Sequence, residues 1–148
     1  MEIKSLDFES GSNIPARFTC DGEGARPELK IEGAPIEAQS LALIVEDPDS
    51  PVGIFTHWIL WNIPADAGSI APDKLPDGSA EGTSDFGKIG YGGPCPNKGI
   101  HHYRFRLYAL SAKLDLPATS SRTDLLLAME GKVLAESELT GLYERRVR

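Results

Sequence analysis

The stretch HHYRFRLYAL, residues 101–110, decides the fold class because its side chains alternate in character. One set of alternate positions is aromatic or apolar after an initial histidine and comprises His101, Tyr103, Phe105 and Leu107. The intervening set is basic and comprises His102, Arg104 and Arg106. Since successive side chains of a β-strand point to opposite faces of the sheet, the stretch predicts a strand with one buried face.

Three further segments extend this β pattern outward along the chain. Residues 41–45 and 57–63 are almost continuously apolar, which is typical of strands covered on both faces. Residues 133–143 alternate between small or apolar and polar side chains. We interpret them as a last strand, with a helix as the alternative because Ala and Glu favour one.

One short helix interrupts the strands near the C-terminal end. Ser120 or Ser121 can cap a helix that contains Leu125 and Met129, and Gly131 is expected to follow its end. The chain also carries 15 glycines and 11 prolines without a low-complexity run, which indicates many turns. We therefore expect a mainly β protein, a β-sandwich formed as a single domain over residues 1–148.

Charge and hydropathy exclude several classes of partner. The 148-residue chain has a formal net charge of −7, so its surface repels nucleic acid and anionic lipid at long range. No apolar stretch approaches the ~20 residues that span a bilayer, and residues 1–4 do not resemble a signal peptide. The sequence predicts a cytoplasmic protein without membrane insertion, in which any anionic ligand is held by a local site.

The two cysteines, Cys20 and Cys95, match no zinc motif in their spacing. In a reducing cytosol, a pair so far apart in the sequence is expected to be two buried thiols. A disulfide is the alternative.

The three histidines are divided by strand geometry. His57 opens an apolar segment and His101 shares a face with Tyr103, so both are expected to point inward. Each can be a satisfied core residue or a ligand-binding one. His102 lies on the opposite face, beside two arginines, and is expected to be solvated. Because adjacent strand residues face opposite ways, His101 and His102 cannot line one site, which excludes a metal site built on that pair.

Two turn-rich segments could complete a site with the histidines. Asp47 directly follows a buried segment, where an unpaired carboxylate is costly, so an imidazole N–H is its expected partner. Asp49 can be a second site residue or simple turn chemistry. In the other segment, Gly93 and Pro94 form a loop whose backbone N–H groups can approach an anion, and Tyr103 can add a hydroxyl donor.

Taken together, five segments resemble the signature of the phosphatidylethanolamine-binding (Raf kinase inhibitor-like) family in its short bacterial and archaeal form. They are FTCDG at residues 18–22, SLALIVEDPDSP at 40–51, HW at 57–58, GTSDFG at 82–87, and GYGGPCP at 90–96 followed by His101 and Tyr103. The chain departs from the family pattern at residues 27–31, at Asn97 and at His102, and these departures are expected to alter the rim more than the pocket.

The resemblance implies a large central sheet, a smaller sheet and one or two short helices. It also implies a small surface pocket for phosphate or phosphoryl head groups. One wall would comprise Asp47, Pro51 and His57, and the other Gly93, Pro94, His101 and Tyr103, with Asp49 in the same signature.

Three functions are compatible with these residues. The first is a non-catalytic binding protein for a phosphate-like anion, without metal or cofactor. The second is an inhibitor of a kinase or protease that acts through the pocket rim and the turn-rich residues 65–99. The third is a hydrolase that uses His and Asp, which the sequence disfavours because no serine or cysteine is placed as a nucleophile. A homodimer is also possible.

Overall fold

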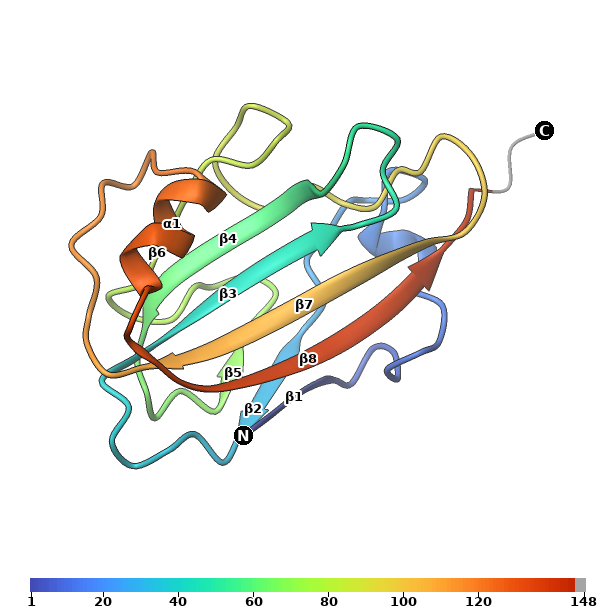
Figure 1. Ribbon diagram of the computed structural model, residues 1–148. Helices are drawn as coiled ribbons and strands as arrows, with labels where there is room; N and C mark the ends of the chain where they lie inside the picture. The colour runs from blue at the N-terminus through green and yellow to red at the C-terminus, as the bar shows by residue number, and fades with distance from the viewer. Residues whose placement is uncertain (146–148) are drawn as a thin grey trace.

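The chain forms two antiparallel β-sheets and a single α-helix in the computed structural model, which describes residues 1–145 (Figure 1). Its elements are β1 (Glu2–Ser5), the 3-10 helix η1 (Ala16–Phe18), β2 (Leu29–Glu32), β3 (Ser40–Asp47), β4 (Phe55–Ile63), β5 (Ser69–Ile70), β6 (Ala80–Glu81), β7 (His101–Leu110), α1 (Arg122–Met129) and β8 (Val133–Tyr143). The larger sheet has five strands in the order β6-β4-β3-β7-β8, and the smaller has three in the order β1-β2-β5. The predicted fold class is confirmed.

The larger sheet is built from the four strands that the sequence pattern indicates. Strand β3 lies at the centre of this sheet, and every residue of β3 is buried. Strand β7 pairs with β3 on one side, with Val45 opposite Phe105, and with β8 on the other, with Phe105 opposite Leu139. Residues 133–143 are therefore a strand and not a helix.

Two hydrophobic layers cover the two faces of this sheet, as Figure 1 shows from the opposite placement of α1 and the small sheet. The larger layer fills the space between the sheets, where Leu43 and Phe105 meet Leu29 of β2. The smaller layer lies under α1, where Ile44 and Leu125 are fully buried. Burial of both faces explains why β3 and β4 are apolar without alternation.

Helix α1 begins at a capping box. The Ser121 hydroxyl accepts a hydrogen bond from the Asp124 backbone N–H, and the Asp124 carboxylate accepts one from the Ser121 N–H. The helix ends at Met129, and Gly131 adopts a positive φ of 75° two residues later. The predicted helix is confirmed, with Ser121 as its cap. No helix in residues 1–145 is long and apolar enough to cross a membrane.

Residues 65–99 are not entirely irregular. They contribute β5 to the small sheet, β6 to the edge of the large sheet, and an isolated bridge between Thr83 and Ile89. Each of these strands has only two residues, too few for a period to be recognised in the sequence.

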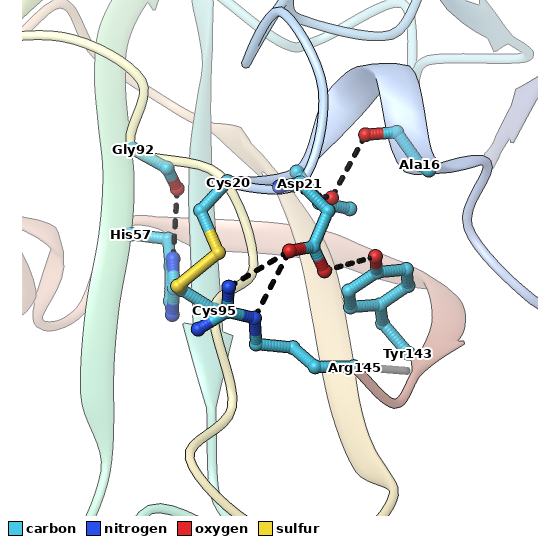
Figure 2. Close-up of a disulfide and its surroundings, with 9 residues drawn as sticks. Ala16, Cys20, Asp21, His57, Gly92, Cys95, Tyr143 and Arg145 are labelled. Carbon is cyan, nitrogen blue, oxygen red and sulfur yellow. Dashed lines mark hydrogen bonds and ion pairs between the residues drawn. A yellow bond between two sulfur atoms is a disulfide. The ribbon is translucent and has the colours of Figure 1, made fainter. Parts of the chain in front are cut away.

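The expectation of two buried thiols is wrong, because Cys20 and Cys95 form a disulfide and both are exposed (Figure 2). Contacts between the two segments bring their Cα atoms to 5.4 Å. The Cys20 N–H donates to the Pro94 carbonyl at 3.1 Å, and the Tyr91 hydroxyl donates to the Phe18 carbonyl at 2.8 Å. This tertiary packing joins positions 75 residues apart, which spacing alone does not reveal.

Candidate functional site

A pocket of about 200 Å³ opens where β3 ends and β4 and β7 begin. It is lined by Asp47, Ser50, Pro51, Val52, Phe55, His57, Phe86, Cys95, Pro96, Asn97, His101 and Tyr103. Antiparallel pairing creates this site, because it places the last residue of β3 beside the first residues of its two neighbours. Five of the eight predicted residues therefore lie together: Asp47, Pro51, His57, His101 and Tyr103.

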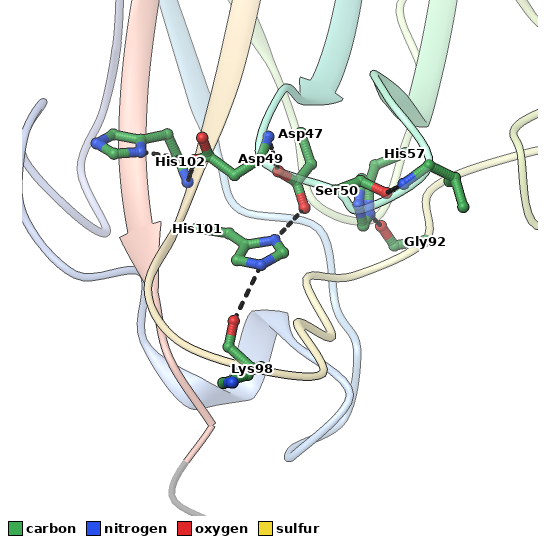
Figure 3. A network of polar contacts seen from close by, with 9 residues as sticks. Asp47, Asp49, Ser50, His57, Gly92, Lys98, His101 and His102 are labelled. Atoms are coloured by element: carbon green, nitrogen blue, oxygen red, sulfur yellow. Dashed lines mark hydrogen bonds and ion pairs between the residues drawn. The ribbon is translucent and has the colours of Figure 1, made fainter.

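Asp47 and His101 form a buried pair at the floor of the pocket (Figure 3). The His101 Nδ1–H donates to Asp47 Oδ2 at 2.6 Å, and Asp47 Oδ1 accepts the Asp49 backbone N–H at 2.8 Å. The second ring nitrogen of His101, Nε2, faces the Lys98 carbonyl at 3.2 Å. Because each ring nitrogen of His101 faces an oxygen of the protein, the ring fixes the wall rather than offering a free group.

His57 is held in a different way, by the backbone of the Gly-Gly-Pro loop. Its Nδ1–H donates to the Gly92 carbonyl at 2.7 Å, while the Gly92 N–H donates to the His57 carbonyl at 2.9 Å. Burial lowers the pKa of His57, against the smaller opposing effect of that bond to Gly92. No hydrogen bond from residues 1–145 reaches Nε2, so this nitrogen is available to a ligand.

Tyr103 carries a second polar group without a partner. Its side chain is 1% exposed, and its hydroxyl has no hydrogen-bond partner among the described residues. Burial raises the pKa of this phenol, so the hydroxyl keeps its proton. A buried polar group without a partner costs free energy unless a ligand or water meets it.

Asp49 faces away from the pocket. Its Oδ2 accepts the backbone N–H and the ring Nδ1–H of His102, at 2.8 and 2.7 Å. These bonds lower the pKa of the Asp49 carboxyl. Asp49 therefore ties the β3–β4 turn to the start of β7, and His102, although exposed, is paired rather than merely solvated.

Gly93 and Pro94 are also absent from the lining and instead contact the turn that contains Phe18 and Cys20. A side chain at Gly93 would meet the Phe18 carbonyl at 2.7 Å, so glycine permits the close approach of that turn. The lining residues from this segment are the next three, Cys95, Pro96 and Asn97. The disulfide from Cys95 holds their position.

Sequence reasoning missed the apolar part of the lining, to which Val52, Phe55 and Phe86 contribute. Phe55 and Phe86 each place their ring centroid 5.1 Å from that of His57, in edge-on orientation. Gly92 lies directly under Phe86, since an added Cβ would meet that ring at 2.2 Å. The signal in the sequence was a phenylalanine within a polar loop, because a large apolar side chain in such a loop is expected to contact other apolar groups.

The profile of one family, described as phosphatidylethanolamine-binding protein, matches residues 4–144. The chain belongs to the phosphatidylethanolamine-binding protein family. Members of this family with solved structures have the same fold. A homologue from Chlamydia trachomatis superposes with a TM-score of 0.93 at 37% identity, over 97% of each chain. Escherichia coli YbcL, described as a member of the mammalian family, gives a TM-score of 0.91 at 30% identity, over 98% of each chain.

Curated relatives of this phosphatidylethanolamine-binding family member include two UPF0098 proteins. The one from Methanothermobacter thermautotrophicus is 51% identical over 98% of this chain and 99% of its own length. The one from Aquifex aeolicus is 43% identical over 98% of this chain and 89% of its own length. The similarity thus covers nearly the whole chain, the pocket included.

Proposed function

We propose that the protein binds a phosphoryl group in this pocket and does not turn it over. The observation that carries the proposal is that two residues lining one small concavity, Tyr103 and His57, each have a polar atom without a partner among residues 1–145, the buried Tyr103 hydroxyl and His57 Nε2. Their ring centroids are 5.2 Å apart. Both can bond to the oxygens of one tetrahedral group, and family membership agrees with a ligand of this kind.

The size of the pocket supports a small head group. A volume of about 200 Å³ is below the roughly 300–1,000 Å³ typical of pockets for drug-sized ligands. The two walls are held by a disulfide and by backbone hydrogen bonds to His57. Such a preformed site binds without the cost of ordering loops.

The hydrogen bonds argue against catalysis. A catalytic histidine base is commonly oriented by a carboxylate, but the carboxylate here, Asp47, orients His101. His101 in turn faces acceptors on both sides and cannot take a proton from a substrate. His57 is oriented by a neutral carbonyl and has a lowered pKa, which makes it a weak base.

An NMR titration at pH 6 tests the proposal, with inorganic phosphate and phosphorylethanolamine as probes. We expect saturable shifts of the His57 and His101 ring signals, while His102, which lies outside the pocket, stays unmoved. Binding should also tighten as the pH falls below about 6.5, because protonation lowers the ligand charge and, at still lower pH, adds a donor at His57, whose pKa lies below its ordinary value. Absence of shifts at millimolar ligand contradicts phosphoryl binding. Hydrolysis of a phosphate ester that depends on His57 contradicts the non-catalytic role.

A second candidate function, inhibition of another protein, is favoured by the exposed apolar side chains of the pocket rim. Val52 is 82% exposed and Ile89, in the turn-rich residues 65–99, is 52% exposed. Exposed side chains of this type often mark interaction surfaces. Val52→Ser with Ile89→Ser should abolish inhibition of a kinase or protease target while phosphate binding persists. Inhibition that survives in this variant contradicts a role for the rim.

A further inference from the structure

Strand β8 is the outer strand of the large sheet, and one of its two edges has no neighbouring strand among residues 1–145 (Figure 1). Along its inner edge β8 pairs with β7. In this part of the chain, its outer edge is covered only near the C-terminal end, where residues 11–14 lie beside it. There the Leu142 N–H donates to the Ser12 carbonyl at 2.9 Å, and the Leu142 carbonyl accepts the Ile14 N–H at 2.7 Å. The outer edge can therefore hold an extended segment, because the chain itself already uses part of it in this way.

The rest of this edge is unpaired. The backbone groups of successive strand residues point to opposite edges, so the outward set that includes Leu142 and Thr140 continues at Glu138 and Glu136. No hydrogen bond within residues 1–145 reaches the outward N–H and carbonyl groups of these two glutamates. Such a row of unpaired groups is a template for pairing with another chain. We call residues 135–139 the free edge; they extend over roughly 14 Å.

The two faces of the free edge differ in chemistry. Glu136 and Glu138 project on the α1 side of the sheet, with side chains 58% and 44% exposed. Arg106 lies near both, but its nitrogens are 3.7 and 3.9 Å from the carboxylate oxygens, longer than the roughly 2.7–2.9 Å of a charge-assisted hydrogen bond. On the other face, Ala135 packs against the apolar layer between the sheets and Leu139 is 1% exposed. A strand added here meets carboxylates on one face and apolar groups on the other.

A second copy of this chain fits the free edge poorly. An antiparallel copy that uses both outward positions places Glu136 directly opposite Glu138 of the other copy, and like charges at opposite positions are destabilising. The formal net charge of −7 adds a general repulsion between copies. The same charges attract a cationic partner.

We propose that the free edge of β8 binds a short extended segment of a partner protein, antiparallel to β8, in which basic residues alternate with apolar ones. Each basic side chain then lies opposite Glu136 or Glu138, and the apolar side chains extend the layer between the sheets. Main-chain hydrogen bonds supply affinity and the alternation supplies selectivity. This surface is separate from the pocket, because Glu138 pairs with Arg106, whereas the pocket residues of β7 lie at its beginning.

Amide hydrogen exchange followed by NMR tests the proposal. The probe is an acetylated and amidated peptide that alternates lysine with valine over about seven residues, long enough to cover the free edge. At millimolar peptide, exchange of the Glu136 and Glu138 amides should slow by about five-fold or more, because their N–H groups gain acceptors. The ring signals of His57 should stay unmoved. Unchanged exchange at millimolar peptide overturns the proposal.

Two N-methylated forms of this peptide separate strand pairing from simple charge attraction. In the proposed antiparallel pairing, the lysines opposite the glutamates donate their own backbone N–H groups to β8, whereas the valine N–H groups point away. Methylation of the lysine backbone nitrogens should abolish the slowing of exchange, and methylation of the valine nitrogens should preserve it. The two forms carry the same charge. Equal behaviour of the two would indicate electrostatic adsorption without strand addition and would overturn the proposal.

Charge reversal tests the chemistry of the partner. Glu136→Lys should weaken binding of the lysine peptide about five-fold and strengthen binding of a peptide that alternates glutamate with valine. Glu23→Lys is the matched control, because it changes the net charge equally but lies exposed in the turn after Cys20, and it should alter affinity by less than about two-fold. Equal weakening in both variants would assign binding to net charge rather than to the free edge and would overturn the proposal.

Discussion

Glu46 and Asp47 are consecutive carboxylates of β3 that face opposite sides of the same sheet, and their surroundings differ sharply. Glu46 is fully buried beneath three arginines, with nitrogen–oxygen distances of 2.6 Å to Arg104, 3.3 Å to Arg122 and 3.7 Å to Arg106. Asp47 is paired with one histidine and borders an open pocket.

The Glu46 cluster is a structural site, whereas the pocket beside Asp47 is the candidate binding site. On the Glu46 side, the three arginines are matched by three carboxylates, Glu46, Glu136 and Glu138, and Arg122 anchors the start of α1 to the sheet. On the Asp47 side, the lining has no free cation, and the Tyr103 hydroxyl lacks a partner within residues 1–145. Buried polar atoms without a partner among residues 1–145 occur on both sides, at Tyr103 on one and at the Nε atoms of Arg104 and Arg122 on the other, so the open pocket is what marks the candidate binding face.

The largest expected effect is on the Glu46 side. Glu46→Gln leaves three half-buried arginines without their central carboxylate and should lower the free energy of unfolding by about 3–5 kcal/mol. Urea denaturation measures the change. Glu136→Gln is the control, because Glu136 is exposed and contacts Arg106 only at 3.7 Å, so its loss should be below about 1 kcal/mol. Similar losses for the two variants would remove the distinction between the cluster and ordinary surface charge.

The next effect concerns the pocket side, which is held by the disulfide. Replacing both cysteines, Cys20→Ser with Cys95→Ser, should lower the free energy of unfolding by about 2–4 kcal/mol, since the bond closes a separation of 75 residues. In NMR spectra, the amide signals of residues 93–98 should shift and broaden, while those of α1 should not. Equal perturbation of α1 would show that the effect of the disulfide is not confined to the pocket side.

A smaller effect of opposite sign is expected for Tyr103→Phe in ligand-free buffer. The change removes a buried hydroxyl that has no protein partner, so stability should be unchanged or rise by up to about 1 kcal/mol. Thermal unfolding without ligand measures this change in stability, and thermal unfolding with phenyl phosphate measures the loss of binding. A clear loss of stability without ligand would indicate that a hidden partner, such as a fixed water, already satisfies the hydroxyl.

The smallest effect is the pH dependence that His57 adds to stability. Its pKa in the folded protein is below the ordinary value of about 6.5, so the unfolded chain binds the proton more readily. The contribution is full above pH 6.5 and is lost as the pH falls towards the folded pKa. Urea midpoints at pH 7.5 and 5.5 should differ less in His57→Asn than in the unaltered protein. An identical difference in both would assign the dependence to other groups.

The sequence pattern predicted the strands that carry the site but not the elements that complete the walls. Residues 41–45, 57–63 and 101–110 have enough length for burial or alternation to be visible, and they became β3, β4 and β7. Strands β1, β2, β5 and β6 have two to four residues each. Their pairing depends on neighbours that are distant in the sequence, so no local pattern reveals them.

In the site as well, the sequence predicted contacts that follow from a residue's own position in a strand but not contacts that depend on distant segments. The partnership of Asp47 with a histidine follows from the cost of burying a lone carboxylate, and the structure supplies His101 as that partner. By contrast, Arg104 shares its face with residues that the alternation leaves to solvent, yet it reaches Glu46 across the neighbouring strand. The lining by Cys95 rather than Gly93 depends on the disulfide, which spacing did not reveal.

The disulfide also changes what a cut in the polypeptide would do. Most of the turn-rich residues 65–99, including the exposed Pro72 and Asp77, lie between Cys20 and Cys95. Cleavage there by a protease gives two fragments that the Cys20–Cys95 bond still joins. They should migrate as one band in non-reducing electrophoresis and as two after reduction. A nicked molecule therefore keeps both parts of the pocket on one covalent assembly.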